Sequence, residues 1–259
     1  MEIRDKYGTI ESFSTLIEEE SDFIVELEKT ILRLKDSENK GVQLYPRPNL
    51  DVLEDYMAEI LYYKYDILLA SYSVGKDIRE IEKQHKDIVA LAERSWKVRQ
   101  DYVMLLHILS IGILLQADTN LFLRLANVVK DNNLIDFLID YLISYKLTDY
   151  LPMNKRQFKW KRPYPFLDNI ISVAQTNKEE AVKQLQQYLT KRWYRGHSDS
   201  GWYNIHVTNL GSHSGYWSFE SGALVKILGL DDSSLKEVQY YPYDMVHWNE
   251  NKNDVNEAG

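Results

Sequence analysis

The sequence of 259 residues contains no cysteine, which excludes disulfide bonds, thiolate metal ligands and a thiol nucleophile. Its N-terminus lacks the basic segment followed by an apolar run that a secretory signal peptide requires. The most apolar stretch, residues 103–115, is shorter than the about 20 residues of a membrane-spanning helix. We therefore expect a cytoplasmic protein without membrane contact, in which residues 103–115 form a buried helix.

Motifs for nucleotide binding and for acyl-transfer catalysis are also missing. There is no P-loop and no G-x-G-x-x-G string. The glycine- and serine-rich strings at residues 196–201 and 211–215 differ from G-x-S-x-G, and no strand precedes them, as a nucleophile elbow requires. No segment alternates apolar and polar residues over several positions, so strands are not expected. These absences predict an all-α protein without a catalytic nucleophile or a cofactor.

The charge of the chain is negative overall and unevenly distributed. The net charge is −8, with 15 acids against 7 bases in residues 1–60 but 4 against 10 in residues 151–200. An acidic protein favours a basic partner over a polyanion, although acidic residues also serve solubility alone. The basic run at residues 155–162 includes Phe158 and Trp160, a composition typical of nucleic-acid contacts. Because the rest of the chain is acidic, we interpret the run as a solvated linker and expect no direct nucleic-acid binding.

Apolar residues recur at spacings of three and four along most of the chain, which predicts amphipathic helices. The first helical stripe covers residues 13–34, and residues 35–48, with Gly41, Pro46 and Pro48, should form a loop. Asn49 is the expected N-cap of a second long helix that ends at Gly75. Further helices are expected at residues 78–115, as one helix or two with a break, and at residues 121–130, 134–145, 166–174, 178–189 and 217–228.

Prolines mark a joint in the second half of the chain. Pro152, Pro163 and Pro165 frame the basic run, and no helix can continue through them. We expect an N-terminal helical module at residues 1–150 and a C-terminal helical module at residues 151–259. The fold class is then all-α, a bundle of long antiparallel helices with a smaller helical C-terminal subdomain and an irregular, aromatic-rich segment at residues 193–215.

Histidines gather in this aromatic-rich segment. His197, Asp199, His206 and His213 are residue types that bind zinc or non-haem iron, which gives the alternative hypothesis of a metal-dependent hydrolase. Their spacing matches no helix-borne motif such as H-E-x-x-H. The competing interpretation, which we prefer, is that these histidines form hydrogen bonds with loop backbone around an aromatic subcore. No metal site is therefore expected.

Four strings carry a resemblance to a known family. They are GYWSFESGALVKILGLDDSSL at residues 215–235, YYPYD at residues 240–244, YDILLASYSVG at residues 65–75 and DFLIDYL at residues 136–142. Together they resemble the PoNi family, the immunity proteins to polymorphic nuclease toxins of the PoNe type, from about residue 10 to residue 247. The resemblance implies an all-α, cytoplasmic, non-enzymatic bacterial protein that binds a cognate DNase toxin and protects the cell. A helical scaffold or regulatory protein with an unrelated partner is the remaining alternative.

Within these strings we expect six residues to determine the fold rather than to bind a partner. Two of them end the second helix and four belong to the C-terminal motif: Tyr72, Gly75, Trp217, Glu220, Gly229 and Asp232. Gly229 should end the last clear helix, and Asp232 should cap the next turn. Glu220 lies among apolar positions and should be buried with a partner, for which Arg195 and His197 are candidates.

The acidic N-terminal helices supply the candidate partner surface. A nuclease must hold a polyanion, so carboxylates presented by an inhibitor can occupy or cover its electropositive groove. The candidate contacts are Tyr45 as an anchor, the first-helix acids Glu18, Glu19, Glu20 and Asp22, and the second-helix acids Asp51, Glu54, Asp55 and Glu59. The alternative interpretation of these acids is a solvated helix face, with Asp51 and Glu54 favourably placed near a helix N-terminus.

Overall fold

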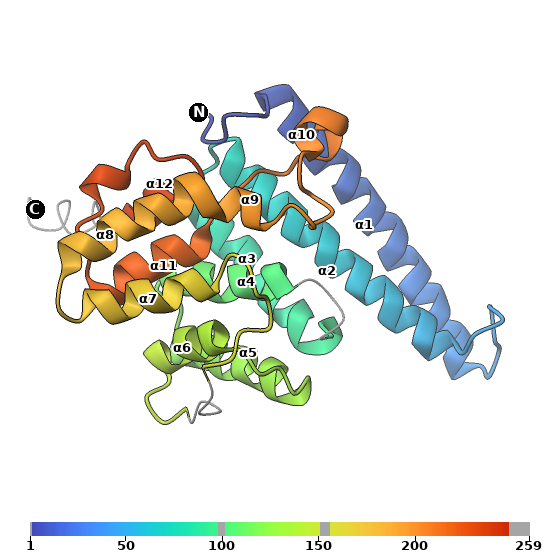
Figure 1. Ribbon diagram of the computed structural model, residues 1–259. Helices are drawn as coiled ribbons and strands as arrows, with labels where there is room; N and C mark the ends of the chain where they lie inside the picture. Colours follow the sequence, from blue (N-terminus) through green and yellow to red (C-terminus); the bar gives the residue numbers. More distant parts are fainter. Residues whose placement is uncertain (1, 98–101, 151–155, 249–259) are drawn as a thin grey trace, which may run out of the picture. The chain divides into compact units, whose positions relative to one another are not determined.

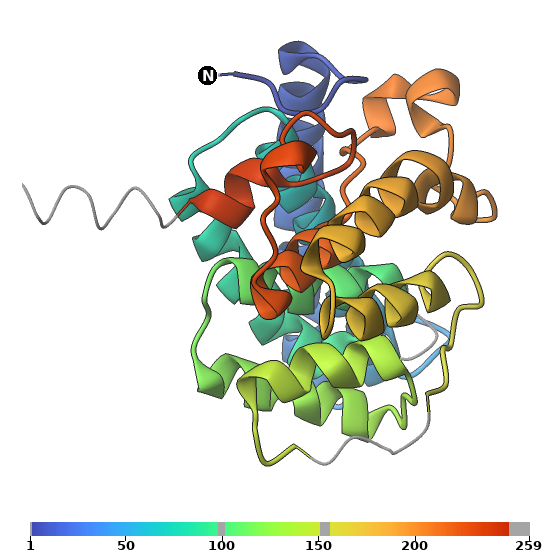
Figure 2. The same cartoon turned by 60° about the vertical axis from the view of Figure 1, so that its left-hand side comes forward.

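A computed structural model describes residues 2–97, 102–150 and 156–248, and these residues contain helices and no strand (Figure 1 and Figure 2). The expected all-α fold is therefore confirmed. The contacts divide the chain into two compact units. The first contains residues 1–100 and 204–215, and the second contains residues 101–203 and 216–259. In the described ranges, every helix is too short or too polar to cross a bilayer.

The first unit consists of three long helices and one returning segment. Helix α1 spans Ile10–Asn39, α2 spans Asn49–Ser73 and α3 spans Ile78–Ser95; the returning segment contains the short helix α10, Ile205–Thr208, and the 3-10 turn η2, Leu210–Ser212. Figure 1 shows α1 and α2 running side by side as an antiparallel hairpin, and α2 packs against α3 as well. The segment η2 packs against α1, so a piece of chain from the C-terminal half completes this unit.

Apolar residues of α1 and α2 form two core clusters along the hairpin. Phe13, Leu16, Ala70 and Val74 form the cluster where α1 begins and α2 ends. Further along the hairpin, towards its loop, Ile24, Ile31 and Ile60 form the second cluster. The spacings of three, four and seven in these sets are those that place residues on one helical face. Five members of the predicted stripe are thus buried, namely Phe13, Leu16, Ile24, Ile31 and Leu34, whereas Phe23, predicted in the same stripe, is 54% exposed.

Two predicted boundaries around the hairpin loop are wrong. Helix α1 continues to Asn39, five residues beyond the predicted last position of its stripe, because Gly41 and not the polar run from residue 35 ends it. Asn49 is the first helical residue of α2 and not its N-cap, which is Pro48. The Asn49 side chain instead bonds the backbone of the preceding loop, where it accepts from the Leu44 N–H at 3.0 Å.

The second unit is built around a helix that is buried along its whole length. Every residue of α4, Tyr102–Leu114, is buried, which confirms the prediction for this apolar stretch. Helix α4 packs against α5, α6 and α11, and α11 also packs against α7 and α12. The other elements are α5 (Thr119–Asp131), α6 (Phe137–Lys146), α7 (Pro165–Ala174), α8 (Lys178–Gln187), the π-helical turn η1 (Tyr188–Trp193), α9 (Tyr194–Gly196), α11 (Phe219–Leu228), the 3-10 turn η3 (Ser233–Leu235) and α12 (Tyr243–His247).

Several helix boundaries follow the sequence signals closely. The predicted stretch 78–115 is divided between α3 and α4, so the version with a break is correct. Asn177 caps α8 by accepting from the Glu180 N–H at 3.0 Å. Gly229 ends α11 in the left-handed region at φ 58°, where glycine has no steric penalty. The compact units are not continuous in sequence, and the boundary between modules at residue 150 stays a prediction.

Candidate protein-binding surface

The acids of α1 are not equivalent in the structure. Glu18, Glu19 and Asp22 are exposed, and their carboxylates face solvent. Glu20 is half-buried, and its pKa is raised to about 9, first by burial and then by the nearby charges of Asp66 and Glu19. At neutral pH the Glu20 carboxyl therefore holds a proton. Three charges of this candidate cluster are available to a partner, while Glu20 is neutral in the free protein.

The acids of α2 are mostly exposed as well. Asp51, Glu54 and Glu59 are exposed, and Asp55 lies 2.8 Å from Arg47 in an ion pair whose two side chains are both well exposed. Asp66, the residue whose charge acts on Glu20, follows Asp55 by 11 positions, which corresponds to about 16 Å along a helix. Because the helices are antiparallel, Asp51, Glu54 and Asp55 lie at another level of the hairpin than the acids of α1. Glu59 differs, since it accepts from Tyr63 Oη at 3.1 Å and the Tyr63 ring stacks on Phe23 of α1.

The predicted anchor Tyr45 lies in the loop that joins α1 to α2. Its side chain is 37% exposed. A hydrogen bond with Tyr45 is the first cause of the raised pKa of Tyr56, so the two hydroxyl groups meet at the start of α2. The Tyr45 carbonyl accepts from Gln43 Nε2 at 2.8 Å. The Tyr45 ring thus lies at the surface, while its carbonyl contacts Gln43 and its hydroxyl contacts Tyr56.

Glu220, in the C-terminal motif, is fully buried in the second unit. Its Oε1 accepts from Ser218 Oγ at 2.7 Å, Trp193 Nε1 at 2.8 Å and Tyr188 Oη at 3.0 Å. Oε2 has no hydrogen-bond partner among the described residues. Burial raises the pKa of this carboxyl to about 7, although the three donors act against the shift.

The expected partners of Glu220, Arg195 and His197, are therefore wrong. His197 is buried, but its Nε2 lies 2.7 Å from Tyr164 Oη and its Nδ1 lies 2.7 Å from the Trp193 carbonyl oxygen. Arg195 is exposed. Two aromatic side chains and one serine donate to Oε1 instead, because η1 brings Tyr188 and Trp193 to it. A π-helical turn has no simple sequence signal.

The other proposed fold-determining residues lie inside the two units. Tyr72 and Trp217 are buried, and Gly75 adopts φ 94°, in the left-handed region. Asp232 is buried and accepts from Tyr241 Oη at 2.6 Å, and its Oδ1 lies 2.9 Å from His247 Nε2. The carboxylate thus connects η3 to α12, and no side-chain cap by Asp232 is observed at the start of η3.

Within the described residues, the histidine-rich segment does not bring metal-ligating side chains together. In the described ranges, no three His, Cys, Asp or Glu side chains lie close enough to hold an ion. His197 belongs to the second unit, whereas His206 and His213 belong to the first. Rings of Trp193 and Trp202 pack around His197, as the alternative of an aromatic subcore requires. The structure therefore does not support the hypothesis of a metal-dependent hydrolase.

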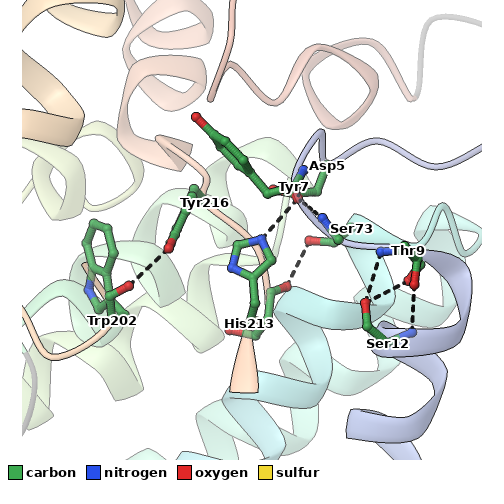
Figure 3. Close-up of polar contacts among 10 residues, drawn as sticks. Asp5, Tyr7, Thr9, Ser12, Ser73, Trp202, His213 and Tyr216 are labelled. Carbon is green, nitrogen blue, oxygen red and sulfur yellow. Dashed lines mark hydrogen bonds and ion pairs between the residues drawn. The ribbon is translucent and has the colours of Figure 1, made fainter. Parts of the chain in front are cut away.

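His213 instead forms a buried pair with Asp5, which the sequence did not reveal. Its Nε2 lies 3.0 Å from Asp5 Oδ1, and both side chains are buried (Figure 3). Asp5 also accepts from the backbone N–H groups of Tyr7 and Gly8. Next to this pair, Ser73 Oγ donates to the Ser214 carbonyl at 2.9 Å. These contacts fasten the residues before α1 and the returning segment to the end of α2. No local pattern could link residues 208 positions apart.

The basic run is partly held by the second unit. The backbone N–H of Lys159 donates to Asp136 Oδ2 at 2.8 Å, and the Phe137 N–H donates to the Gln157 carbonyl at 2.7 Å. These bonds tie the run to the beginning of α6. Lys155 lies outside the described residues. The side chains of Arg156, Lys159, Lys161 and Arg162 are exposed, as in a solvated linker, and the expectation of no nucleic-acid binding stays a prediction.

Comparisons with known proteins agree over most of the chain. The family model described as the N-terminal part of the PoNe immunity proteins (PoNi) matches residues 4–127, and the model of their C-terminal part matches residues 134–245. A solved structure, the crystal structure of protein PA2201 from Pseudomonas aeruginosa, is similar with a TM-score of 0.62 at 16% sequence identity. The similarity covers 98% of this chain and 100% of that chain, and it concerns the fold. No curated protein matches.

Proposed function

Because the chain belongs to the family of immunity proteins to PoNe nuclease toxins, we propose that it binds one cognate DNase toxin through its acidic α1–α2 hairpin and neutralises it. Proteins of this family are inhibitors and not enzymes. The family assignment is the observation that carries the proposal. We assign the toxin contact to the acidic hairpin because a nuclease groove that binds DNA must be electropositive.

The structure supports this surface by leaving most of its carboxylates accessible. Glu18, Glu19 and Asp22 on α1 and Asp51, Glu54 and Glu59 on α2 are all exposed. Such charges chiefly accelerate association and select the partner, whereas buried contacts supply most of the affinity. Glu20 plays a different role in this proposal. A basic side chain of the toxin placed beside it would lower its pKa, so binding would release a proton.

Two charge-reversed variants test the proposal. One carries lysine at positions 18, 19 and 22, and the other carries lysine at positions 51, 54 and 59. The matched control places lysine at the exposed acids Asp131, Asp149 and Glu237 of the second unit. Each full-length protein is co-expressed with the nuclease encoded beside it, and binding kinetics and plasmid degradation are measured at two salt concentrations.

We expect at least one hairpin variant to associate about tenfold or more slowly than wild type, with a weaker salt dependence, and to protect plasmid poorly. The control should behave like wild type, because it changes the net charge equally without touching the hairpin. If both hairpin variants bind as wild type does, the acidic surface is not the contact. If wild type itself neither binds nor inhibits the nuclease, the proposed partner is wrong.

A further inference from the structure

The tip of the α1–α2 hairpin, residues 40–50, exposes an unusual amount of apolar surface. Four side chains here are well exposed: Val42 at 51%, Leu44 at 47%, Tyr45 at 37% and Leu50 at 56%. One of the four, Leu50, lines an open pocket of about 230 Å³ together with Leu34 and Leu53. Single exposed apolar residues are ordinary, but four of them within nine residues, one of which lines a pocket, indicate an interaction surface.

The loop backbone at this tip has a fixed shape. Gly41 adopts φ 68°, and the Val42 N–H donates to the Ser37 carbonyl at 2.9 Å, as in a Schellman helix end. Asn49 is only 3% exposed and joins the two sides of the loop. It accepts from the Leu44 N–H at 3.0 Å, and its Nδ2 donates to the Val42 carbonyl at 2.8 Å. A buried side chain thus holds the backbone of two exposed apolar residues.

A loop held in this way loses little conformational entropy when a partner binds. The hydrogen bonds of Asn49, the contact between Tyr45 and Tyr56, and the ion pair between Arg47 and Asp55 all exist in the free chain. Preorganisation of this kind raises affinity because the cost of ordering the contact residues is met during folding. The tip therefore has the properties of an affinity anchor and not of a flexible linker.

The charges around the tip define the chemistry of its partner. The two tip cations are paired within the chain, Lys40 with Asp36 at 2.7 Å and Arg47 with Asp55 at 2.8 Å. Glu38 lines the pocket, and the exposed acids Asp51 and Glu54 follow the lining residues Leu50 and Leu53 in the sequence. These three acids form no ion pair within the described part of the chain. One further cation, Lys35, lines the pocket, so three acids stand against one lysine here and the rim has a net negative charge. A complementary surface carries an apolar side chain next to lysine or arginine.

We propose that the hairpin tip is the affinity anchor for the nuclease toxin. An apolar or aromatic side chain of the toxin fills the pocket next to Leu50, and adjacent basic side chains pair with Glu38, Asp51 and Glu54. Asn49 acts as a positioning residue that keeps Val42 and Leu44 in the binding conformation. This inference rests on the proposed function, and it assigns the anchoring role to the apolar residues of the tip, next to the acids Asp51 and Glu54 of the second-helix cluster.

The test compares tip variants with a matched variant elsewhere in the full-length chain. Leu44→Ser and Leu50→Ser remove apolar contacts from exposed positions, and Leu123→Ser makes the same change at a 52% exposed leucine of α5. We expect Leu44→Ser and Leu50→Ser together to increase the dissociation rate of the toxin complex at least about tenfold with little change in association rate. Leu123→Ser should change neither rate more than about twofold.

Asn49→Ala tests the positioning role separately. Loss of its hydrogen bonds should accelerate amide exchange at Leu44 in the free protein and weaken toxin binding, while the helices remain folded. If the double leucine variant binds a toxin as tightly as wild type does, the anchor assignment is overturned while the immunity function stands. If wild type binds no toxin, the proposed function itself fails. If Asn49→Ala exchanges and binds as wild type does, Asn49 is not a positioning residue.

Discussion

Glu220→Gln should remove a loss of stability that the wild-type protein suffers as the pH rises. The carboxyl is fully buried, and its pKa is raised from 4.5 to about 7 by burial, against the effect of three hydrogen-bond donors. Between these two pH values the folded protein holds a proton that the unfolded chain has released. The free energy of unfolding therefore falls as pH rises through this interval, and the loss is complete above about pH 7.

The size of the effect follows from the shift. A difference of about 2.5 pKa units, at 1.36 kcal/mol per unit, corresponds to about 3 kcal/mol of lost stability. Glutamine keeps an oxygen that can accept from Ser218, Tyr188 and Trp193, and it cannot ionise. It resembles the protonated acid in size and polarity. The variant should thus match wild type at about pH 5 and exceed it by about 3 kcal/mol at about pH 8.

Urea unfolding followed by tryptophan fluorescence measures both proteins at the two pH values. The informative quantity is the difference in unfolding free energy between variant and wild type, because every other titrating group cancels in it. Glu237→Gln, at an exposed carboxylate of the same unit, is the control and should show no pH-dependent difference. A Glu220→Gln difference that stays constant from pH 5 to pH 8 would refute the raised pKa and the reasoning from burial.

Two further predictions concern the packing of the second unit and a buried polar pair of the first. In Gly222→Ala the new Cβ would lie 2.9 Å from Val246 Cγ2 and 3.0 Å from Pro242 Cγ. We expect this overpacking to lower the unfolding free energy by about 1–3 kcal/mol. Gly201→Ala, whose Cβ meets no described atom within 4 Å, is the control and should be nearly neutral in thermal unfolding. Asp5→Ala should lower the unfolding free energy by about 1–3 kcal/mol because it removes the buried acceptor of His213 Nε2, and Asp5→Asn should cost less. Burial raises the pKa of Asp5, but His213 and two backbone N–H groups outweigh the effect of burial, so the pKa is lowered from 3.8. Wild type should therefore lose this stabilisation only as the pH falls below 3.8. Equal acid sensitivity of wild type and Asp5→Asn would contradict the assignment.

Local patterns were sufficient to predict most helices. The stripe of α1, the apolar length of α4, the cap at Asn177 and the end at Gly229 depend on residues a few positions apart, which a periodic pattern or a capping preference detects. Asn49 shows where this fails. Asparagine before an apolar run favours an N-cap, but here its amide bonds the loop, and only the folded hairpin reveals that competing use.

Contacts between distant residues could not be predicted from the sequence. The burial of Glu220 was foreseen from its apolar neighbours, but charge alone suggested Arg195 and His197 as partners, and the actual donors come from η1. The candidate acids on α1 and α2 were identified correctly as helical positions. The proton held by Glu20 follows from burial and from the charge of Asp66, which the antiparallel pairing brings near and no spacing rule predicts.

The discontinuous first unit has a consequence for synthesis on the ribosome. Helices α1 to α3 are complete once Ser95 has emerged, yet the partner of Asp5 is His213, which follows 118 positions later. At about 5–20 residues per second this interval lasts on the order of 6–24 s. During that time Asp5, which is buried in the folded protein, does not yet have the His213 imidazole as its partner. A chain stopped at either family-model boundary, residue 127 or residue 134, would remain in that incomplete state.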